Sequence, residues 1–274
     1  MSQTLLKLDK VSVSFGGLKA VADLDLELSE GELVGLIGPN GAGKTTVFNL
    51  ITGVYTPTSG SIYFRGHPIH GLKPHRIARA GITRTFQNIR LFPSMTSVEN
   101  ICVAAHQHAR AGFVHAVLRT RTFQDDEAAI LRRASELLET MGLAEWADTR
   151  ASELPYGQQR RLEVARALAG APKLVLLDEP AAGLNPQESE QLMRLIEDIR
   201  MRFGLAILLI EHDMRVVMGV CRRIAVLDYG IKIAEGTPGE IRANPKVIEA
   251  YLGEEVHADF GENSKLPRDE DSHA

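Results

Sequence analysis

Several features that identify common protein classes are scarce or missing in this chain of 274 residues. No segment approaches the ~20 consecutive apolar residues of a membrane-spanning helix, so any role at a membrane is expected to depend on a partner. The start, Met1 to Leu5, lacks the basic residues and the long apolar stretch of a signal peptide. Cys102 and Cys221 lack metal-ligand spacing, and we expect both to be reduced thiols of a cytosolic protein.

An excess of positive charge is also missing. The formal net charge is −4, so no overall basic field predicts binding to nucleic acid. The basic stretch from Arg110 to Arg121 is short and has few aromatic residues, and we expect it not to bind nucleic acid either. Hydrophobic residues make up 44% of the chain and charged residues 24%, which indicates a globular protein, here with one domain and an inserted subdomain.

A glycine-rich loop is the first feature that indicates a function. It matches the phosphate-loop pattern G-x-x-x-x-G-K-[ST] without a mismatch and consists of Gly38, Pro39, Asn40, Gly41, Ala42, Gly43, Lys44, Thr45 and Thr46. The apolar run 33–37 predicts a buried strand before the loop, and residues 47–52 predict a helix after it, ended by Gly53. Glycine backbone N–H groups and a helix N-terminus together make a cradle for phosphate.

Two side chains of the loop have expected roles. Lys44 should reach the β- and γ-phosphates of a nucleotide, and the Thr45 hydroxyl should bind Mg²⁺. A plain glycine-rich turn with a surface lysine is the alternative, and both the pattern and its strand–loop–helix context argue against it.

Two further apolar runs end in polar residues. Residues 174–177 run into Asp178 and Glu179, and residues 205–210 are followed by His212. Ligands of open α/β sheets bind outside the carboxyl ends of the strands. We therefore expect Asp178 to hold the Mg²⁺ shell, Glu179 to orient or deprotonate the attacking water, and His212 to contact the γ-phosphate. Solvated acids and a structural histidine are the alternatives.

Aromatic and histidine positions elsewhere give weaker signals. Phe15 ends the first strand-like segment, and the sequence leaves open whether it stacks on an adenine ring or fills the core. His106, His108 and His115 have no cysteine or carboxylate cluster beside them, so they are expected to be surface histidines rather than metal ligands. A turn over 154–158 opens an amphipathic helix, whose N-terminus is a second candidate anion site.

The remaining patterns outline the organisation of the chain. From residue 88 to 152 the pattern is helical, which indicates an insertion between two halves of a nucleotide-binding core. Residues 254–274 are polar and acidic and are expected to form a mostly disordered tail. Further expected elements are strands at 5–15, 24–28 and 61–64, a helix capped by Thr96 or Ser97 and running over 101–108, helices over 125–141 and 188–200, a hairpin of 224–227 with 231–234, and a closing helix from Pro238.

These motifs, in this order, resemble the ATP-binding subunits of ABC transporters over about residues 5–253. The resemblance implies an α/β fold. It would have a P-loop NTPase core with a mostly parallel sheet, an N-terminal antiparallel β portion, and a helical subdomain inserted at about 88–165. Residues 1–253 would then form a single ATP-binding domain that hydrolyses ATP with Mg²⁺.

The individual residues of these motifs are similar to those of one subfamily, the longer of the two ATPases of branched-chain amino acid importers. The resemblance implies a bacterial protein bound peripherally at the cytoplasmic face of the inner membrane. Its implied partners are a second ABC ATPase subunit, two integral-membrane permease subunits and, indirectly, a periplasmic or extracellular substrate-binding protein. It is carried by the loop over 35–49, the segments 84–87, 156–163, 178–186 and 210–214, the insert around 105–124, and the ending 250–253.

Matched positions carry implied roles. Gln87 would be the glutamine that touches Mg²⁺ and relays to the membrane subunit. Tyr156, Gly157 and Gln158 would belong to the signature motif, which contacts the γ-phosphate held by the other ATPase subunit. Pro155 and Tyr156 replace the serine and a glycine of the general L-S-G-G-Q, and Asn185 stands where the general family has aspartate. Proline removes a hydroxyl and an N–H group that a phosphate would otherwise contact.

Three other functions are alternatives. The ATPase of a lipopolysaccharide exporter has similar motifs and a similar ending, but the insert and the tyrosine-containing signature argue against it. ABC ATPases of translation or DNA repair generally carry two cassettes or a long coiled coil, and this chain has neither pattern. A P-loop GTPase would need the base-reading N-K-x-D motif, which the sequence lacks.

Overall fold

The computed structural model of the protein describes residues 3–109, 112, 115 and 117–251. Its strands form two sheets. The first is a four-stranded antiparallel sheet in the order β2-β1-β4-β5. It consists of β1 (Thr4–Phe15), β2 (Leu18–Ser29), β4 (Ser59–Phe64) and β5 (His67–Pro68). The expected N-terminal antiparallel portion is therefore present.

The second sheet has six strands in the order β10-β9-β3-β8-β7-β6. All neighbours in it are parallel except β9 and β10, which form the predicted antiparallel hairpin. The strands are β3 (Leu33–Ile37), β6 (Ile82–Arg84), β7 (Leu174–Asp178), β8 (Ala206–Ile210), β9 (Arg223–Asp228) and β10 (Ile231–Gly236). The mostly parallel core sheet is thus confirmed, together with the α/β fold class.

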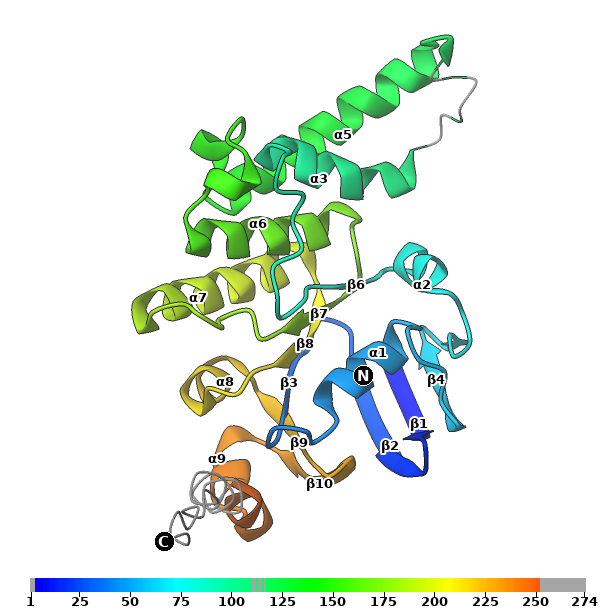
Figure 1. Ribbon diagram of the computed structural model, residues 1–274, viewed down its shortest axis with the longest axis vertical. Coiled ribbons are helices and arrows are strands. Elements are labelled where there is room, and N and C mark those ends of the chain that lie inside the picture. Colours follow the sequence, from blue (N-terminus) through cyan, green and yellow to red (C-terminus); the bar gives the residue numbers. More distant parts are fainter. Residues whose placement is uncertain (1–2, 110–111, 113–114, 116, 252–274) are drawn as a thin grey trace, which may run out of the picture.

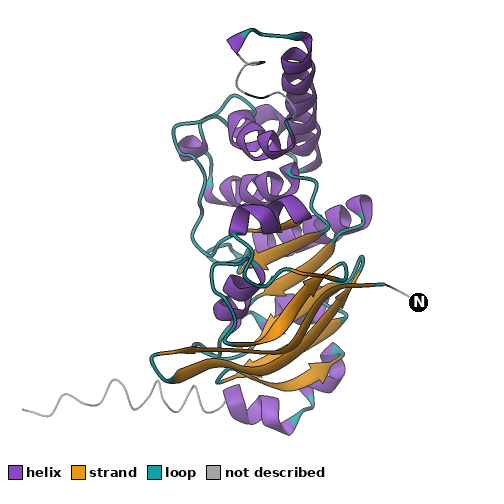
Figure 2. Ribbon diagram, turned by 90° about the vertical axis from the view of Figure 1, so that its right-hand side faces the viewer, coloured by secondary structure: helices purple, strands orange, loops and turns teal. Residues whose placement is uncertain are grey.

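The helices α3, α5 and α6 stack at one end of the molecule, beyond α7, whereas α1, α2, α8 and α9 lie beside the strands (Figure 1). Figure 2 shows from the side that the upper part of the molecule is helical, whereas the strands lie in the lower part with further helices around them. The α-helices are α1 (Lys44–Ile51), α2 (Pro74–Ala80), α3 (Ser97–Ala105), α5 (Arg121–Thr140), α6 (Tyr156–Ala169), α7 (Pro186–Phe203), α8 (Met214–Val220) and α9 (Pro238–Arg242). Short 3₁₀ helices span His106–His108, Ala144–Trp146 and Ala151–Glu153.

Local side chains explain where several helices begin. Thr96 caps α3 and forms a capping box with Glu99, as one of the two predicted caps. Asn185 caps α7 in the same way with Glu188, and Pro186 occupies the first turn, where a missing N–H group does no harm.

The parallel sheet is buried on both faces, which accounts for its uninterrupted apolar strands. Along β8, Ile207 and Leu209 belong to the core cluster beneath the helices α5 to α7. Their neighbours Ala206, Leu208 and Ile210 belong to a second cluster that includes β1, β2 and α1. Since strand side chains alternate between faces, one sheet connects both cores and fixes the edge at which its strands end.

Some expected boundaries were wrong, and some elements were not expected. The helix after the glycine-rich loop begins at Lys44 rather than at residue 47, and α5 begins at Arg121 rather than at 125. The elements α2, β6 and α8 were not identified, because each is too short for a clear apolar period. The predicted helical segment 88–165 contains α3 and α5, and α6 runs past its end. The expected tail, 254–274, lies outside the described residues.

None of the helices that the structure describes combines the length and apolarity that crossing a bilayer requires. Likewise, no group of three or more His, Cys, Asp or Glu side chains in the described ranges could hold a metal ion. His106 instead contacts Glu127, with 3.0 Å between Nε2 and Oε1, and His115 lies 3.1 Å from the Thr120 hydroxyl.

Candidate nucleotide-binding site

The glycine-rich loop joins the carboxyl end of β3 to the N-terminus of α1. Gly38 has a φ of 150°, and a Cβ there would lie 2.0 Å from the carbonyl oxygen of Leu227. Gly43 precedes α1 with a φ of 100°, and its Cβ would lie 2.7 Å from the carbonyl oxygen of Ala20. Only glycine fits both positions, so the loop can turn tightly against β9 and β2.

Hydrogen bonds within the chain hold the shape of the loop. Lys44 is buried, and its ammonium donates to the carbonyl oxygens of Gly38 and Pro39 at 2.6 and 2.8 Å. The backbone N–H of Gly230, in the β9–β10 turn, donates to the carbonyl of Ala42 at 3.0 Å. The first N–H groups of α1 have no intrahelical partners, as in any helix, and Thr45 in that turn is exposed. This arrangement can bind an anion such as phosphate.

Two of the predicted site residues, Gln87 and His212, meet at a third, Glu179. The Nε2 of Gln87 donates to Glu179 Oε2 at 2.8 Å, and His212 Nδ1 lies 3.6 Å from the same oxygen. Glu179 has a φ of 46°, a left-handed backbone that costs a residue with a Cβ on the order of 1 kcal/mol or more. Its N–H donates to the carbonyl of Ile210 at 2.9 Å, which helps to hold that backbone in place.

Asp178 is buried at the carboxyl end of β7, as expected for a strand-end acid. Its Oδ2 accepts a hydrogen bond from Arg84 Nη2 at 2.6 Å, and both side chains are almost fully buried. No pattern in the sequence predicted a role for Arg84 by itself. The available signal was its place three positions before Gln87 in the segment 84–87.

Glu211 is a second residue that the sequence did not single out. Its side chain is buried, and Oε1 accepts a hydrogen bond from the N–H of Ala181 at 2.8 Å. Burial raises the pKa of Glu211, and the nearby carboxylate of Glu179 raises it further. Glu211 therefore links the segment of His212 to the turn that follows Glu179.

The predicted signature residues begin α6. The hydroxyl of Tyr156 donates to the carbonyl of Ala182 at 3.0 Å and accepts from Arg160 Nη2 at 2.8 Å. Arg160 also donates to the carbonyl of Gln87 at 2.7 Å, so the start of α6 is tied to the segment that carries this glutamine. Gly157 and Gln158 are half-buried, and Gln158 Oε1 has no hydrogen-bond partner within the described part of the chain.

A buried carboxyl completes this connection. Glu163 lies 3.3 Å from Arg160 Nη1, and its other oxygen accepts from the N–H of Phe86 at 3.3 Å. Burial raises the pKa of Glu163, against the lowering effect of these partners. The sequence analysis gave Arg160 and Glu163 no individual role, because their contacts with Phe86 and Gln87 span more than 70 residues of the chain.

Phe15 is not a core residue, which resolves one alternative. Its side chain is 44% exposed, and its ring packs edge-on against Tyr55 with 4.9 Å between centroids. Stacking on an adenine ring stays a prediction, and the exposed ring is free to make such a contact.

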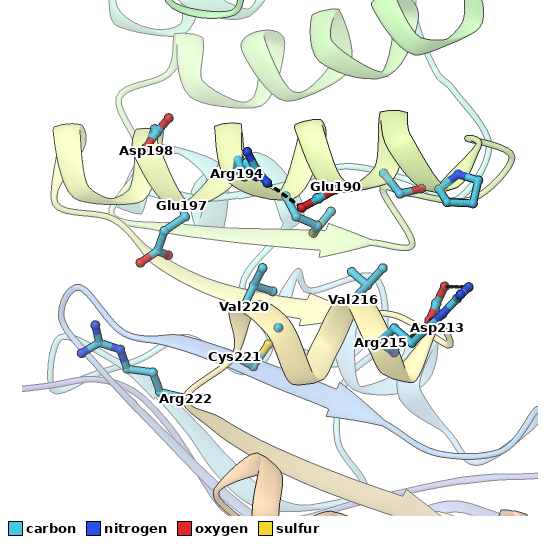
Figure 3. Close-up of a pocket in the computed structure, with 14 residues that line it drawn as sticks. Glu190, Arg194, Glu197, Asp198, Asp213, Arg215, Val216, Val220, Cys221 and Arg222 are labelled. Carbon is cyan, nitrogen blue, oxygen red and sulfur yellow. Dashed lines mark hydrogen bonds and ion pairs between the residues drawn. The ribbon is translucent and has the colours of Figure 1, made fainter.

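A separate cavity of about 820 Å³ lies between α7 and α8. Figure 3 shows charged side chains around it, including the paired Glu190 and Arg194 on α7. None of the predicted nucleotide-contacting residues lines this cavity. Burial raises the pKa of Cys221, at its floor, to about 12, so the thiol is protonated at neutral pH and is a poor nucleophile.

Comparisons with known proteins agree with this arrangement. The model of the ABC transporter family matches residues 21–182, and that of the branched-chain amino acid ATP-binding cassette transporter family matches residues 232–257. The high-affinity branched-chain amino acid transport ATP-binding protein LivG of Salmonella typhimurium is 52% identical over 93% of this chain and 100% of its own. Its counterpart BraF of Pseudomonas aeruginosa is 48% identical over the same shares.

Solved structures have the same fold. The ADP conformation of MJ1267, an ATP-binding cassette of an ABC transporter, superimposes with a TM-score of 0.80 at 29% identity and covers 92% of this chain and 100% of that one. The family model covers more than half of the chain, and the relatives extend the likeness along nearly its whole length. By its sequence and its fold, this chain therefore belongs to the ATP-binding proteins of the ABC transporter family.

Proposed function

We propose that this chain is the ATP-hydrolysing subunit that powers an importer of branched-chain amino acids. The observation that best supports ATP hydrolysis is that Gln87 and His212 both approach one oxygen of Glu179, at the edge of the sheet where β7 and β8 end. The choice of cargo is supported by the names of the relatives and by the match of residues 232–257.

The geometry supports the following reaction. The loop N–H groups and Lys44 bind the phosphates, and Phe15 stacks on the adenine. Water attacks the γ-phosphorus while the Glu179 carboxylate takes its proton, and the bond to the β-phosphate oxygen breaks as ADP leaves. His212 contacts the γ-phosphate and limits the positions that Glu179 can adopt.

The donor set fits Mg²⁺, which prefers oxygen ligands and retains part of its water shell. Thr45 offers a hydroxyl and Asp178 a carboxylate, whose Oδ1 has no hydrogen-bond partner among the described residues. Gln87 uses its amide nitrogen toward Glu179, which leaves its amide oxygen for the metal. When bound, Mg²⁺ would neutralise charge on the β- and γ-phosphates.

The proposal includes partners, since the signature residues would complete a site on another subunit. Tyr156, Gly157 and Gln158 would close the nucleotide site of a second ABC ATPase, packed head-to-tail. Closure of the pair would drive two permease subunits between inward- and outward-facing states at the inner membrane, with cargo delivered by a substrate-binding protein.

Transport assays test the cargo. The chromosomal gene is replaced by a Lys44→Ala version, and uptake of radiolabelled leucine, isoleucine and valine is measured. We expect uptake of all three to fall to the level of a gene deletion, while an exposed control, Lys73→Ala, retains wild-type uptake. Normal uptake in Lys44→Ala cells, combined with lipopolysaccharide held at the inner membrane, would contradict the importer and favour the exporter.

A further inference from the structure

We infer that Arg84 is a positioning residue for Asp178 and that it sets how well the site binds a divalent cation together with ATP. The inference rests on the proposed function, because it assigns Asp178 to the metal. Arg84 ends β6, the edge strand of the parallel sheet, and its side chain enters the interior rather than solvent.

One guanidinium connects two elements of the site. Its Nη2 donates to Asp178 Oδ2 on β7, and its Nη1 donates to Asn49 Oδ1 on α1, each at 2.6 Å. These partners lie 94 and 35 residues away in the sequence. Because α1 also carries Thr45, the fork of Arg84 fixes the strand-end carboxylate relative to the helix that follows the phosphate loop.

Neighbouring rings and backbone restrict the fork further. The guanidinium carbon lies 5.3 Å from the ring centroid of Phe48 and 5.1 Å from that of Phe86. The N–H of Asp178 donates to the Thr85 hydroxyl at 3.2 Å, which ties the backbones of β6 and β7 beside the ion pair. The carboxylate therefore has one oxygen committed to Arg84 and the other available to a ligand.

Charge and position predict opposite effects on metal binding. A positive charge beside the site repels a cation, so a merely electrostatic Arg84 would weaken Mg²⁺ binding. A hydrogen-bond partner that orients a ligating carboxylate strengthens metal binding, and its loss typically costs about 10- to 100-fold in affinity. A lysine keeps the charge but cannot bridge two acceptors with a planar fork, so Arg84→Lys separates the two effects.

The experiment measures metal binding without turnover. Glu179→Gln protein is loaded with ATP, and Mn²⁺, used as the spectroscopic probe, is titrated and followed by electron paramagnetic resonance. ATP affinity is measured separately in EDTA. We expect Arg84→Lys to raise the Mn²⁺ concentration for half-saturation by about tenfold or more, with ATP affinity in EDTA changed by less than about twofold.

Two further variants complete the test. Asn49→Ala removes only one arm of the bridge and should raise the half-saturating Mn²⁺ concentration in the same direction by a smaller factor. If circular dichroism shows that Arg84→Lys does not fold, the result for Asn49→Ala alone tests the inference. Arg90→Lys is the matched control, because Arg90 contacts the ring of Phe86 at 4.4 Å but is bonded to neither Asp178 nor Asn49.

Several results would overturn the inference. One is unchanged Mn²⁺ binding both in Asn49→Ala and in folded Arg84→Lys. Another is tighter Mn²⁺ binding in folded Arg84→Lys. The third is a loss of ATP affinity in EDTA as large as the loss of Mn²⁺ affinity. A parent protein that binds no ATP in EDTA and none with Mn²⁺ would instead refute the proposed function, so the two failures are distinguishable.

Discussion

His212 Nδ1 lies 3.6 Å from Glu179 Oε2, although the two residues follow different strands of the parallel sheet, β8 and β7. Parallel strands bring their carboxyl ends to one edge of the sheet, so residues far apart in the chain can form one site there. The same oxygen accepts a hydrogen bond from Gln87, and the carboxylate is therefore held from two sides.

Glu179→Gln should stop hydrolysis and leave ATP binding intact. An amide has nearly the same shape as a carboxylate but cannot take the proton of water, and one fewer negative charge lowers repulsion of the nucleotide. We expect kcat to fall at least about 100-fold. With Mg-ATP and the second ATPase present, size-exclusion chromatography should show a stable pair. Near-normal hydrolysis would refute the role of Glu179, and a mutant that stays monomeric in every pairing would count against the shared site.

Lys44→Ala should weaken ATP binding by about 10- to 100-fold, since a hydrogen bond to a charged group contributes about 1.5–3 kcal/mol. The change also removes the two hydrogen bonds that Lys44 makes to the loop carbonyls. Isothermal titration with Mg-ATP measures the affinity. Arg79→Ala, on the exposed end of α2, is the control for loss of a single cation and should bind normally. Equal affinities for Lys44→Ala and wild type would exclude the loop as the phosphate site.

Phe15→Ala should weaken adenine nucleotides by about 1–3 kcal/mol through the lost stacking contact. The melting temperature should change little, because the ring is 44% exposed and its contact with Tyr55 is at the surface. Titrations with ATP and with inorganic triphosphate separate the base from the phosphates, and only the former should weaken. A large drop in melting temperature with normal ATP affinity would mean that Phe15 serves stability instead.

Arg160→Met should destabilise the fold by about 3–5 kcal/mol, because it leaves the buried Glu163 without its ion-pair partner. The double change Arg160→Met with Glu163→Leu should recover part of that loss, since the buried carboxylate is then removed as well, while the N–H of Phe86 loses its acceptor. Urea denaturation measures both free energies of unfolding. A single variant as stable as wild type would show that the ion pair contributes little.

Glu32→Gln should lower stability by roughly 1 kcal/mol at pH 7, a modest value because the pair with Arg223 is partly exposed. Burial alone would raise the pKa of Glu32, but hydrogen bonds from Arg223 and from the Ser29 N–H lower it below 4.5. A depressed pKa stabilises the fold above 4.5, and this contribution is lost as the pH falls through the folded-state pKa.

The measurement for Glu32 is urea denaturation at several pH values. The difference between wild type and Glu32→Gln should shrink as the pH falls below 4.5. Glu27→Gln, at a more exposed pair with Lys7, is the comparison and should change stability less at every pH. A difference that grows on acidification would contradict the assignment.

The sequence alone determined the local features of this protein. The glycine pattern of the loop, the apolar runs of β3, β7 and β8, and the cap at Thr96 were all readable, because each depends on backbone geometry or burial within a short segment. The family followed from the order of these motifs. The short elements α2, β6 and α8 were not predicted, because about two helical turns or three strand residues carry too little periodicity.

Only the tertiary structure decided which of these segments touch. The sheet order β9-β3-β8-β7-β6 differs from the chain order, so the meeting of Gln87, Glu179 and His212 on one oxygen was not visible in the sequence. The hydrogen bond from Arg84 to Asp178 and the exposure of Phe15 were also decided by the tertiary structure. Contacts of this kind depend on strand order and on packing between distant segments, whereas the sequence patterns report only on near neighbours in the chain.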